Sequence, residues 1–233
     1  ACVESLRRGE TATFDSVWGS SCALLTSALA QEFKNILVVV ADGKTQDDLL
    51  DDLPTFFEGI LERFPACMPA SSAGVHLDLE YGDRLRLIKG LLAGDKSPVI
   101  VATVPSLLQP TPSQESIFGN SKRIAVGDQI DIAGFAAWLL EQEFHQTSAV
   151  ELPGEFSIRG GILDVYAPDW ENPVRIELFD DEVESLRQFE CANQRSSAEL
   201  QQIEITVVTQ DGPENGCLLD FIPDDTVLLL LEP

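Results

Sequence analysis

Three short apolar runs predict the strands of a parallel sheet. They span residues 36–40, 99–102 and 227–231, and each is apolar at consecutive positions rather than at alternate ones. This pattern is typical of parallel strands that helices cover on both faces. We also expect a weaker strand at residues 13–18, directly before a helix.

Helical periodicity separates these runs. Residues 22–33 carry apolar side chains three and four positions apart, and so do residues 84–92. The second helix is flanked by Asp83, a good N-cap, and by Gly94, a good residue just past a helix end. Alternating strands and helices predict an α/β domain with a parallel sheet.

The pattern changes after a proline-rich turn at residues 109–113. An amphipathic helix is expected at residues 132–144. Strands with turn residues between them are expected at 149–152, 155–159, 162–166, 174–179, 182–189 and 203–208. This middle segment predicts a small α+β domain with a mostly antiparallel sheet.

Because the last apolar run resembles the first two, we expect the small domain to be inserted into the α/β domain. The expected division is residues 1–120, then the insert at 121–208, then a return to the α/β domain at 209–233. The chain starts without Met and stops directly after an apolar run, so we also expect it to be a piece of a longer protein.

The charge excludes several classes of function. The chain has 15 Lys and Arg against 39 Asp and Glu, a formal charge of −24. A general nucleic-acid binder needs an excess of cations to displace counterions, and an anionic membrane surface would repel this chain. Five widely spaced cysteines predict free thiols in a reducing cytoplasm, and two distant histidines make a structural zinc site improbable. We expect no metal and no other cofactor.

A degenerate nucleotide loop is expected at Gly19, Ser20, Ser21, Cys22 and Ala23. A phosphate-binding loop between a strand and a helix needs several glycines, a Lys for the phosphates and a Ser or Thr for magnesium. Here Cys22 stands where the Lys would be, and Ala23 stands where the hydroxyl would be. The chain end offers only Glu232 as an acidic group. We therefore expect no ATP binding and no catalytic residue.

Arginines mark the small domain as a candidate binding surface. The only cations between residues 123 and 208 are Arg123, Arg159, Arg175, Arg187 and Arg195. Several alternate with apolar residues on expected strands, so they project from one sheet face. They can pair with the surrounding carboxylates, or they can form a protein-binding face beside an aromatic side chain. Composition alone leaves both interpretations open.

A longer motif gives the small domain a family resemblance. Residues 154–164 read Gly-Glu-Phe-Ser-Ile-Arg-Gly-Gly-Ile-Leu-Asp, and residues 173–189 continue with Pro-Val-Arg-Ile-Glu-Leu-Phe-Asp-Asp-Glu-Val-Glu-Ser-Leu-Arg-Gln-Phe. Together with Gln194, Arg195 and Ser196, this resembles the N-terminal part of bacterial transcription-repair coupling factor, which is similar to the excision-repair helicase UvrB. The resemblance implies a helicase-like α/β domain interrupted by a UvrA-binding module.

The resemblance also implies a function. The expected partner is UvrA, and the positions that match the family's UvrA contacts are Arg159, Arg175 and Phe179; Ser157 stands where UvrB-type sequences carry a further Arg. The longer parent would be an ATP-dependent DNA translocase that displaces stalled RNA polymerase, while this part would bind neither ATP nor DNA itself. We expect Arg159 and Arg175 on neighbouring strands, and Phe179 on the face that carries Arg175.

Other functions stay open at this point. One alternative is a UvrB-like nucleotide-dependent repair helicase subunit, although the loop at residues 19–23, the chain end and the short stretch at 54–98 all depart from UvrB. That stretch is too short for UvrB's DNA-clamping hairpin, and its only tyrosine is Tyr81. Two further alternatives are a nucleotide hydrolase with an unusual loop and a nucleic-acid-binding module.

Overall fold

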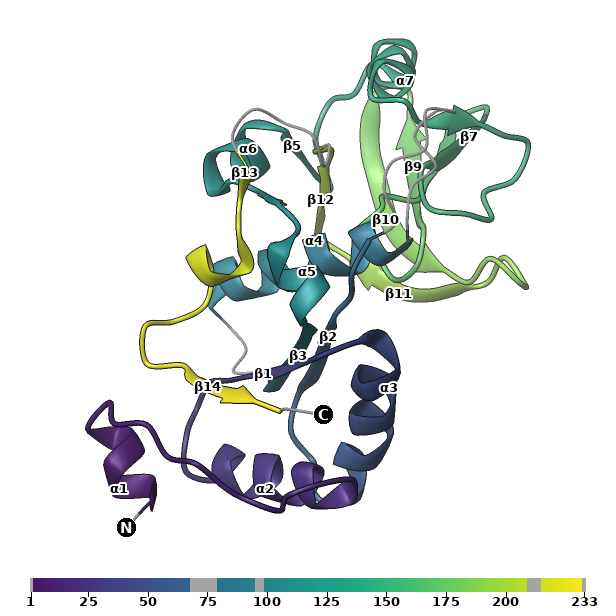
Figure 1. The fold of residues 1–233 in the computed structure, drawn as a ribbon. Coiled ribbons are helices and arrows are strands. Elements are labelled where there is room, and N and C mark those ends of the chain that lie inside the picture. Colours follow the sequence, from purple (N-terminus) through teal and green to yellow (C-terminus); the bar gives the residue numbers. More distant parts are fainter. Residues whose placement is uncertain (1, 68–78, 95–98, 209–214, 232–233) are drawn as a thin grey trace. The chain divides into compact units, whose positions relative to one another are not determined.

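The structure is a computed structural model that describes residues 2–67, 79–94, 99–208 and 215–231. The chain divides into two compact units (Figure 1). The first unit comprises Ala1–Cys67, Asp83–Thr111 and Gly216–Pro233, and the second comprises Met68–Gly82 and Pro112–Asn215. Glu232 and one of the two histidines, His76, lie outside the described residues.

A four-stranded parallel sheet forms the centre of the first unit. Its strand order is β14-β1-β3-β2, with β1 at Ile36–Val40, β2 at Leu61–Phe64, β3 at Val99–Thr103 and β14 at Val227–Leu230. The three apolar runs are therefore parallel strands of one sheet, as the sequence predicts. All residues of β1 and β3 are buried, but Leu228 and Leu230 on β14 are exposed, because only alternate residues of this last strand pack against the core.

The helices of the first unit are α1 (Cys2–Arg7), α2 (Ser20–Ala30), α3 (Gly43–Asp52), the 3₁₀ turn η1 (Leu53–Thr55), most of α4 (Leu79–Ala93) and α5 (Val104–Leu108). Side chains from α2, α3 and η1 share a core cluster with β1 and β3. Asp42 caps α3 by accepting a hydrogen bond from the Thr45 amide, 2.8 Å away.

Two local expectations in this unit are wrong. Residues 13–18, all within the described part of the chain, form no strand. Helix α4 begins at Leu79, four residues before Asp83, so Asp83 cannot be its N-cap; its carboxylate instead accepts a hydrogen bond from Arg86. The C-terminal expectation is confirmed, since Gly94 adopts a left-handed φ of 73° just past the helix end.

A buried arginine holds the loop that follows β3 and α5. Arg84 on α4 donates hydrogen bonds to the backbone carbonyls of Pro65, Ser106, Gln109 and Pro110, at 3.0–3.2 Å. Its guanidinium also lies over the Phe64 ring, 4.1 Å from the centroid. Buried charge is tolerated here because carbonyl dipoles and a π face replace its hydration.

A six-stranded sheet dominates the second unit. Its order is β11-β10-β9-β8-β7-β6, from β6 (His145–Gln146) through β7 (Glu155–Arg159), β8 (Ile162–Val165), β9 (Val174–Phe179) and β10 (Glu182–Phe189) to β11 (Ser196–Leu200). Every pair is antiparallel except β6 with β7. The α/β class with a parallel and a mostly antiparallel sheet is therefore confirmed.

Helix α7 (Ile132–Glu141) fills the second core. Phe135 and Leu139 pack with the inner side of the large sheet and with a two-stranded pair, β5 (Ser121–Ala125) and β12 (Gln202–Thr206). The remaining short elements are α6 (Gln114–Gly119), β4 (Thr111–Pro112), β13 (Asn215–Gly216) and the 3₁₀ turn η2 (Leu218–Asp220). The predicted strand at 149–152 is wrong: these described residues form a loop, and the Glu155 carboxylate accepts hydrogen bonds from the Glu151 and Leu152 amides.

Within the described ranges, no helix combines the length and the apolar character that crossing a bilayer requires.

Candidate protein-binding face

The two faces of the large sheet differ in chemistry. Residues such as Phe156, Leu163 and Ile176 point into the core, so the alternate residues of the same strands point to the opposite side. We call the group on that opposite side the arginine face, and it consists of Arg159 on β7, Asp164 on β8, and Arg175 and Phe179 on β9.

Two glycines shape the turn that places Arg159. Arg159 pairs with Ile162 across the two-residue turn Gly160–Gly161. Gly160 has a φ of 63°, which L-residues rarely adopt. A Cβ on Gly161 would lie 2.8 Å from the carbonyl oxygen of Leu178, so β9 can approach only a glycine here. The Gly-Gly pair of the motif is therefore required by the backbone.

The register places the two arginines differently from the prediction. They do not lie on neighbouring strands: β8 runs between β7 and β9, and Asp164 on β8 pairs directly with Arg175. The prediction was wrong because the motif's own Ile162–Val165 segment forms the intervening strand. The expected shared face of Arg175 and Phe179 is confirmed, since Leu178 between them packs on the core.

One carboxylate binds both arginines. Arg175 donates from Nε to Oδ1 of Asp164 at 2.7 Å and from Nη2 to Oδ2 at 2.9 Å. Arg159 donates from Nη2 to the same Oδ2 at 2.8 Å. The interpretation that the arginines pair with nearby carboxylates is thus correct for both, and the carboxylate they share is almost completely buried, with 1% of its side chain exposed.

The members of the face differ in exposure. Arg175 has 18% of its side chain exposed, Arg159 has 52%, and Phe179 is 72% exposed. The hydrogen bonds to Asp164 raise the pKa of Arg175 above its ordinary value, against the opposing effect of burial. Arg159 and Phe179 are consequently the groups most available to a partner, while Arg175 is largely committed to the sheet.

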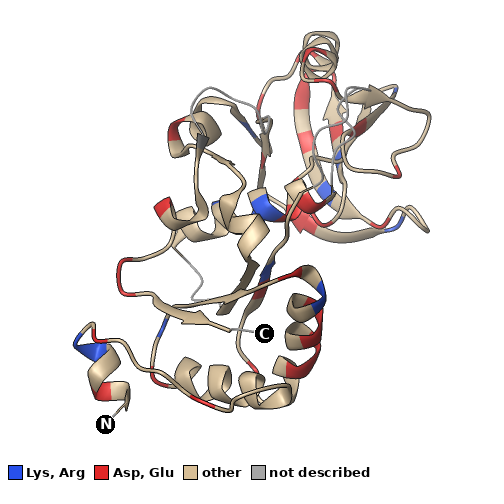
Figure 2. Cartoon of the chain, in the orientation of Figure 1, with Lys and Arg blue, Asp and Glu red and all other residues tan. Residues whose placement is uncertain are grey.

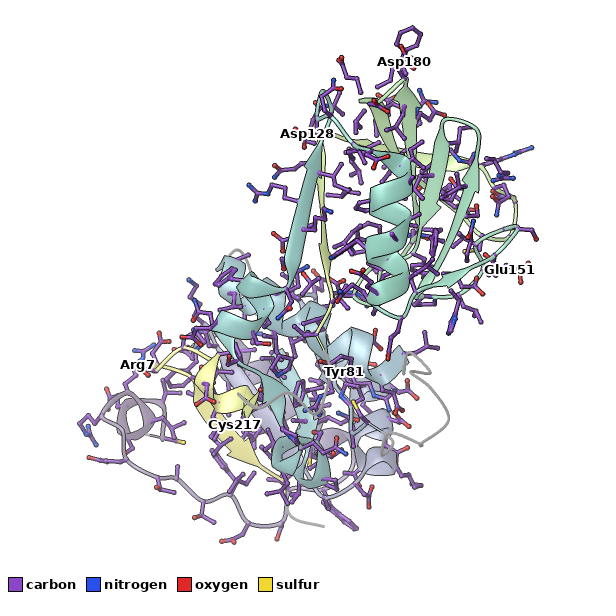
Figure 3. All side chains as sticks on the ribbon, turned by 90° about the horizontal axis from the view of Figure 1, so that it is seen from above. Arg7, Tyr81, Asp128, Glu151, Asp180 and Cys217 are labelled. Carbon is purple, nitrogen blue, oxygen red and sulfur yellow. The ribbon has the colours of Figure 1, made fainter. Side chains whose placement is uncertain are left out.

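Phe179 stands at one end of the sheet. It precedes the turn of the β9–β10 hairpin, whose Asp180 has a left-handed φ of 53° and lies at the tip of the second unit in Figure 3. Arg159 on β7 pairs with Ile162 on β8, and Ile162 pairs with Glu177 on β9, so these three residues form one row across the sheet. Phe179 lies two residues beyond Glu177 on β9, on the same face of the sheet.

A cavity of about 390 Å³ is lined by residues of β9, β10 and β11 together with Val126 and Gln201. Arg187 is part of its lining and approaches Glu177 at 3.7 Å and Glu199 at 3.9 Å, distances longer than those at Asp164. Glu177 also accepts a hydrogen bond from Ser185 at 2.6 Å. Arg187 thus lies near Glu177 and Glu199, whereas Arg159 and Arg175 both pair with Asp164.

Three residues of this region have roles that the sequence motif does not assign. Asp164 is the shared acceptor, Phe189 lies under the Arg175 guanidinium at 4.8 Å, and Gln194 accepts a further hydrogen bond from Arg175 at 3.3 Å. The sequence contains one signal for the role of Asp164: it is a carboxylate in the otherwise apolar strand Ile-Leu-Asp-Val, which indicates a buried ion pair. Ser157, opposite Asp164, is buried, so it presents no contact surface.

The candidate nucleotide loop lies at the start of α2. Helix α2 begins at Ser20, and Gly19 before it has a φ of 54°. The Cys22 amide donates to the Gly19 carbonyl at 2.9 Å, so it is already used within the turn. Ala23 is buried in the core cluster, and burial raises the pKa of the Cys22 thiol. In the described part of the chain, no group of three or more His, Cys, Asp or Glu could hold a metal ion.

Comparison with known proteins identifies the relatives of this chain. Residues 123–210, which contain the whole arginine face, match the family model of the UvrB interaction domain. The transcription-repair-coupling factor of Bacillus subtilis is 36% identical over 193 residues, covering 80% of this chain and 16% of the relative. This chain is homologous to the transcription-repair-coupling factors. The Mycobacterium bovis factor is 35% identical, covering 78% of this chain and 15% of its own length, and the Myxococcus xanthus factor is 28% identical, covering 87% and 18%.

The homology confirms the resemblance drawn from the motif. It extends well beyond the interaction domain, since the alignments cover about four fifths of the chain. The chain nevertheless spans only about a sixth of the length of these coupling factors.

Proposed function

We propose that this UvrB interaction domain binds UvrA through the arginine face. One observation carries the proposal: the domain exposes Phe179 and half of Arg159 on a single sheet face. Aromatic and arginine side chains dominate the energy of protein–protein interfaces. The guanidinium of Arg159 can bind a partner carboxylate, while the Phe179 ring can fill an apolar pocket.

The biological role that we propose is recruitment. In a longer coupling factor, this part of the chain would bring UvrA to a stalled RNA polymerase for nucleotide excision repair, by presenting to UvrA a surface like that of UvrB. Contacts with RNA polymerase and DNA would come from other parts of the parent protein, as would the ATP-dependent motor. This assignment rests on the homology and on the interaction domain.

We further propose that the first unit neither binds nor hydrolyses ATP. A phosphate-binding loop joins a strand to a helix, but residues 13–18 before α2 form no strand in the described structure. The loop offers no Lys, and Ala23 is buried where a magnesium-binding hydroxyl would be needed. The resulting function is that of an adaptor.

We also propose that the second unit does not bind DNA. The segment from Arg123 to Val208 has five arginines and seventeen acidic residues, a net charge of −12. Figure 2 shows acidic residues spread over several strands of the large sheet, with few basic ones. Such a surface repels the phosphate backbone.

Titration of purified UvrA with the chain and its variants tests the binding proposal. Arg159→Ala and Phe179→Ala should each weaken the affinity at least about tenfold, as expected for interface hot spots. Matched controls are Arg123→Ala, which removes an exposed arginine from β5, and Phe118→Ala, which removes a ring that is 60% exposed on α6. Both controls should bind like the wild type. Equal affinity of all five proteins would reject the arginine face as the UvrA site.

A further inference from the structure

Asp164 accepts two hydrogen bonds from Arg175 but only one from Arg159. Arg175 approaches it through both Nε and Nη2, so the two groups form a bidentate pair. The Arg175 guanidinium also lies on the Phe189 ring and donates to Gln194. Four contacts thus fix Arg175 in one orientation.

Arg159 makes fewer contacts than Arg175. Its only hydrogen bond among the described residues runs from Nη2 to Oδ2 of Asp164, and half of its side chain is exposed. An arginine has five N–H donors, so Nε and Nη1 remain available for an acceptor outside the chain. Among the described residues no hydrogen bond or ion pair joins Arg159 to Glu177, which instead accepts a hydrogen bond from Ser185 and lies 3.7 Å from Arg187.

We propose that Asp164 is a positioning residue for recognition: it holds the Arg159 guanidinium through Nη2 and leaves the remaining N–H groups to bind a carboxylate of the partner. The N–H groups of Arg159 that Asp164 does not use are suited to an anionic acceptor. Asp164 itself is too buried to touch a partner. This inference rests on the proposed UvrA function and adds to it the partner's chemistry, an Asp or Glu side chain opposite Arg159.

The effect of Asp164 on affinity should be smaller than that of Arg159. An arginine that is already immobilised loses less side-chain entropy on binding. Asp164→Asn keeps the volume and one acceptor oxygen but removes the charge. We expect this variant to weaken UvrA binding about 3- to 10-fold.

A double-mutant cycle separates positioning from a merely structural role. It compares the wild type, Asp164→Asn, Arg159→Ala and the double variant in calorimetric titrations with UvrA, below their melting temperatures. Because Asp164 acts through Arg159, the loss caused by Asp164→Asn should shrink to less than about twofold when Arg159 is absent. A structural defect would reduce the affinity by the same factor in both backgrounds, and that result would overturn the inference.

Two further outcomes distinguish this inference from the function on which it rests. If Arg159→Ala binds UvrA like the wild type, the positioning role is rejected, and the proposed face is rejected as well if Phe179→Ala also binds like the wild type. If Arg159→Ala weakens binding while Asp164→Asn does not, only the positioning role is rejected.

A second measurement needs no variant that could fail to fold. Side-chain ¹⁵N relaxation in the free wild-type chain should show Arg159 Nε more ordered than Nε of the exposed Arg123. Equal mobility of the two arginines would contradict the positioning role of Asp164.

Discussion

Removing Arg175 should destabilise the second unit far more than removing Arg159. Arg175→Ala deletes two hydrogen bonds to Asp164 and the stacking contact with Phe189, and it leaves the Asp164 carboxylate 1% exposed with only Arg159 as a charged partner. Breaking a buried ion pair by deleting one partner costs about 3–5 kcal/mol. Because Arg159 can still neutralise the carboxylate, we expect a loss of about 2–4 kcal/mol in the free energy of unfolding.

Arg159→Ala is the comparison for Arg175→Ala, because Arg159 pairs with the same Asp164 carboxylate. Arg159→Ala removes a single hydrogen bond from a side chain that is half exposed, and such pairs contribute about 0–1 kcal/mol. Urea denaturation followed by circular dichroism measures both variants against Arg123→Ala as the surface control. Arg175→Ala within about 0.5 kcal/mol of the wild type would refute the assignment of Arg175 as an anchor of the sheet. A difference of that size is typical of surface substitutions.

This difference also affects how binding data for Arg175 should be interpreted. Loss of UvrA binding by Arg175→Ala would combine a lost contact with a disturbed sheet. Arg159→Ala and Phe179→Ala avoid this ambiguity, because both side chains are substantially exposed.

Two further predictions concern ligands that the chain should not bind. Millimolar Mg-ATP should leave the melting temperature unchanged, because residues 19–23 provide neither a Lys nor an accessible hydroxyl at the required positions; a rise that Gly19→Ala or Ser20→Ala abolishes would contradict this. Duplex DNA should show no micromolar gel shift at about 0.15 M salt, because the net charge of −12 between residues 123 and 208 opposes counterion release. A salt-sensitive shift in that range would show that the charge balance does not decide DNA binding.

The fold could be predicted where side-chain pattern alone determines the structure. Strands β7, β9 and β10 have the predicted bounds, because apolar and polar residues alternate between flanking turns. Strand β11, with the sequence Ser-Ser-Ala-Glu-Leu, was missed because it lacks this alternation and is mostly exposed. The loop at 149–152 resembles a strand in composition, but the Glu155 carboxylate binds its backbone amides instead.

Only the part of the candidate site that lies on a single strand could be predicted, because the rest depends on how the strands pair. Parity along β9 places Arg175 and Phe179 on one face, which needs no knowledge of neighbouring strands. The position of Arg159 depends on strand order, and the partnership between Asp164 and Arg175 depends on a register between residues eleven positions apart. Neither can be derived from local pattern, so the aspartate that connects the arginines emerged only from the structure.

Competition between this chain and UvrB for UvrA tests the central claim most directly. A labelled chain is bound to purified UvrA, and unlabelled UvrB is titrated into the complex while fluorescence anisotropy reports the bound fraction. If the UvrB interaction domain presents a UvrB-like face, UvrB should displace the wild-type chain completely. A chain that does not bind UvrA, or one that stays bound while UvrB saturates UvrA, would contradict the account.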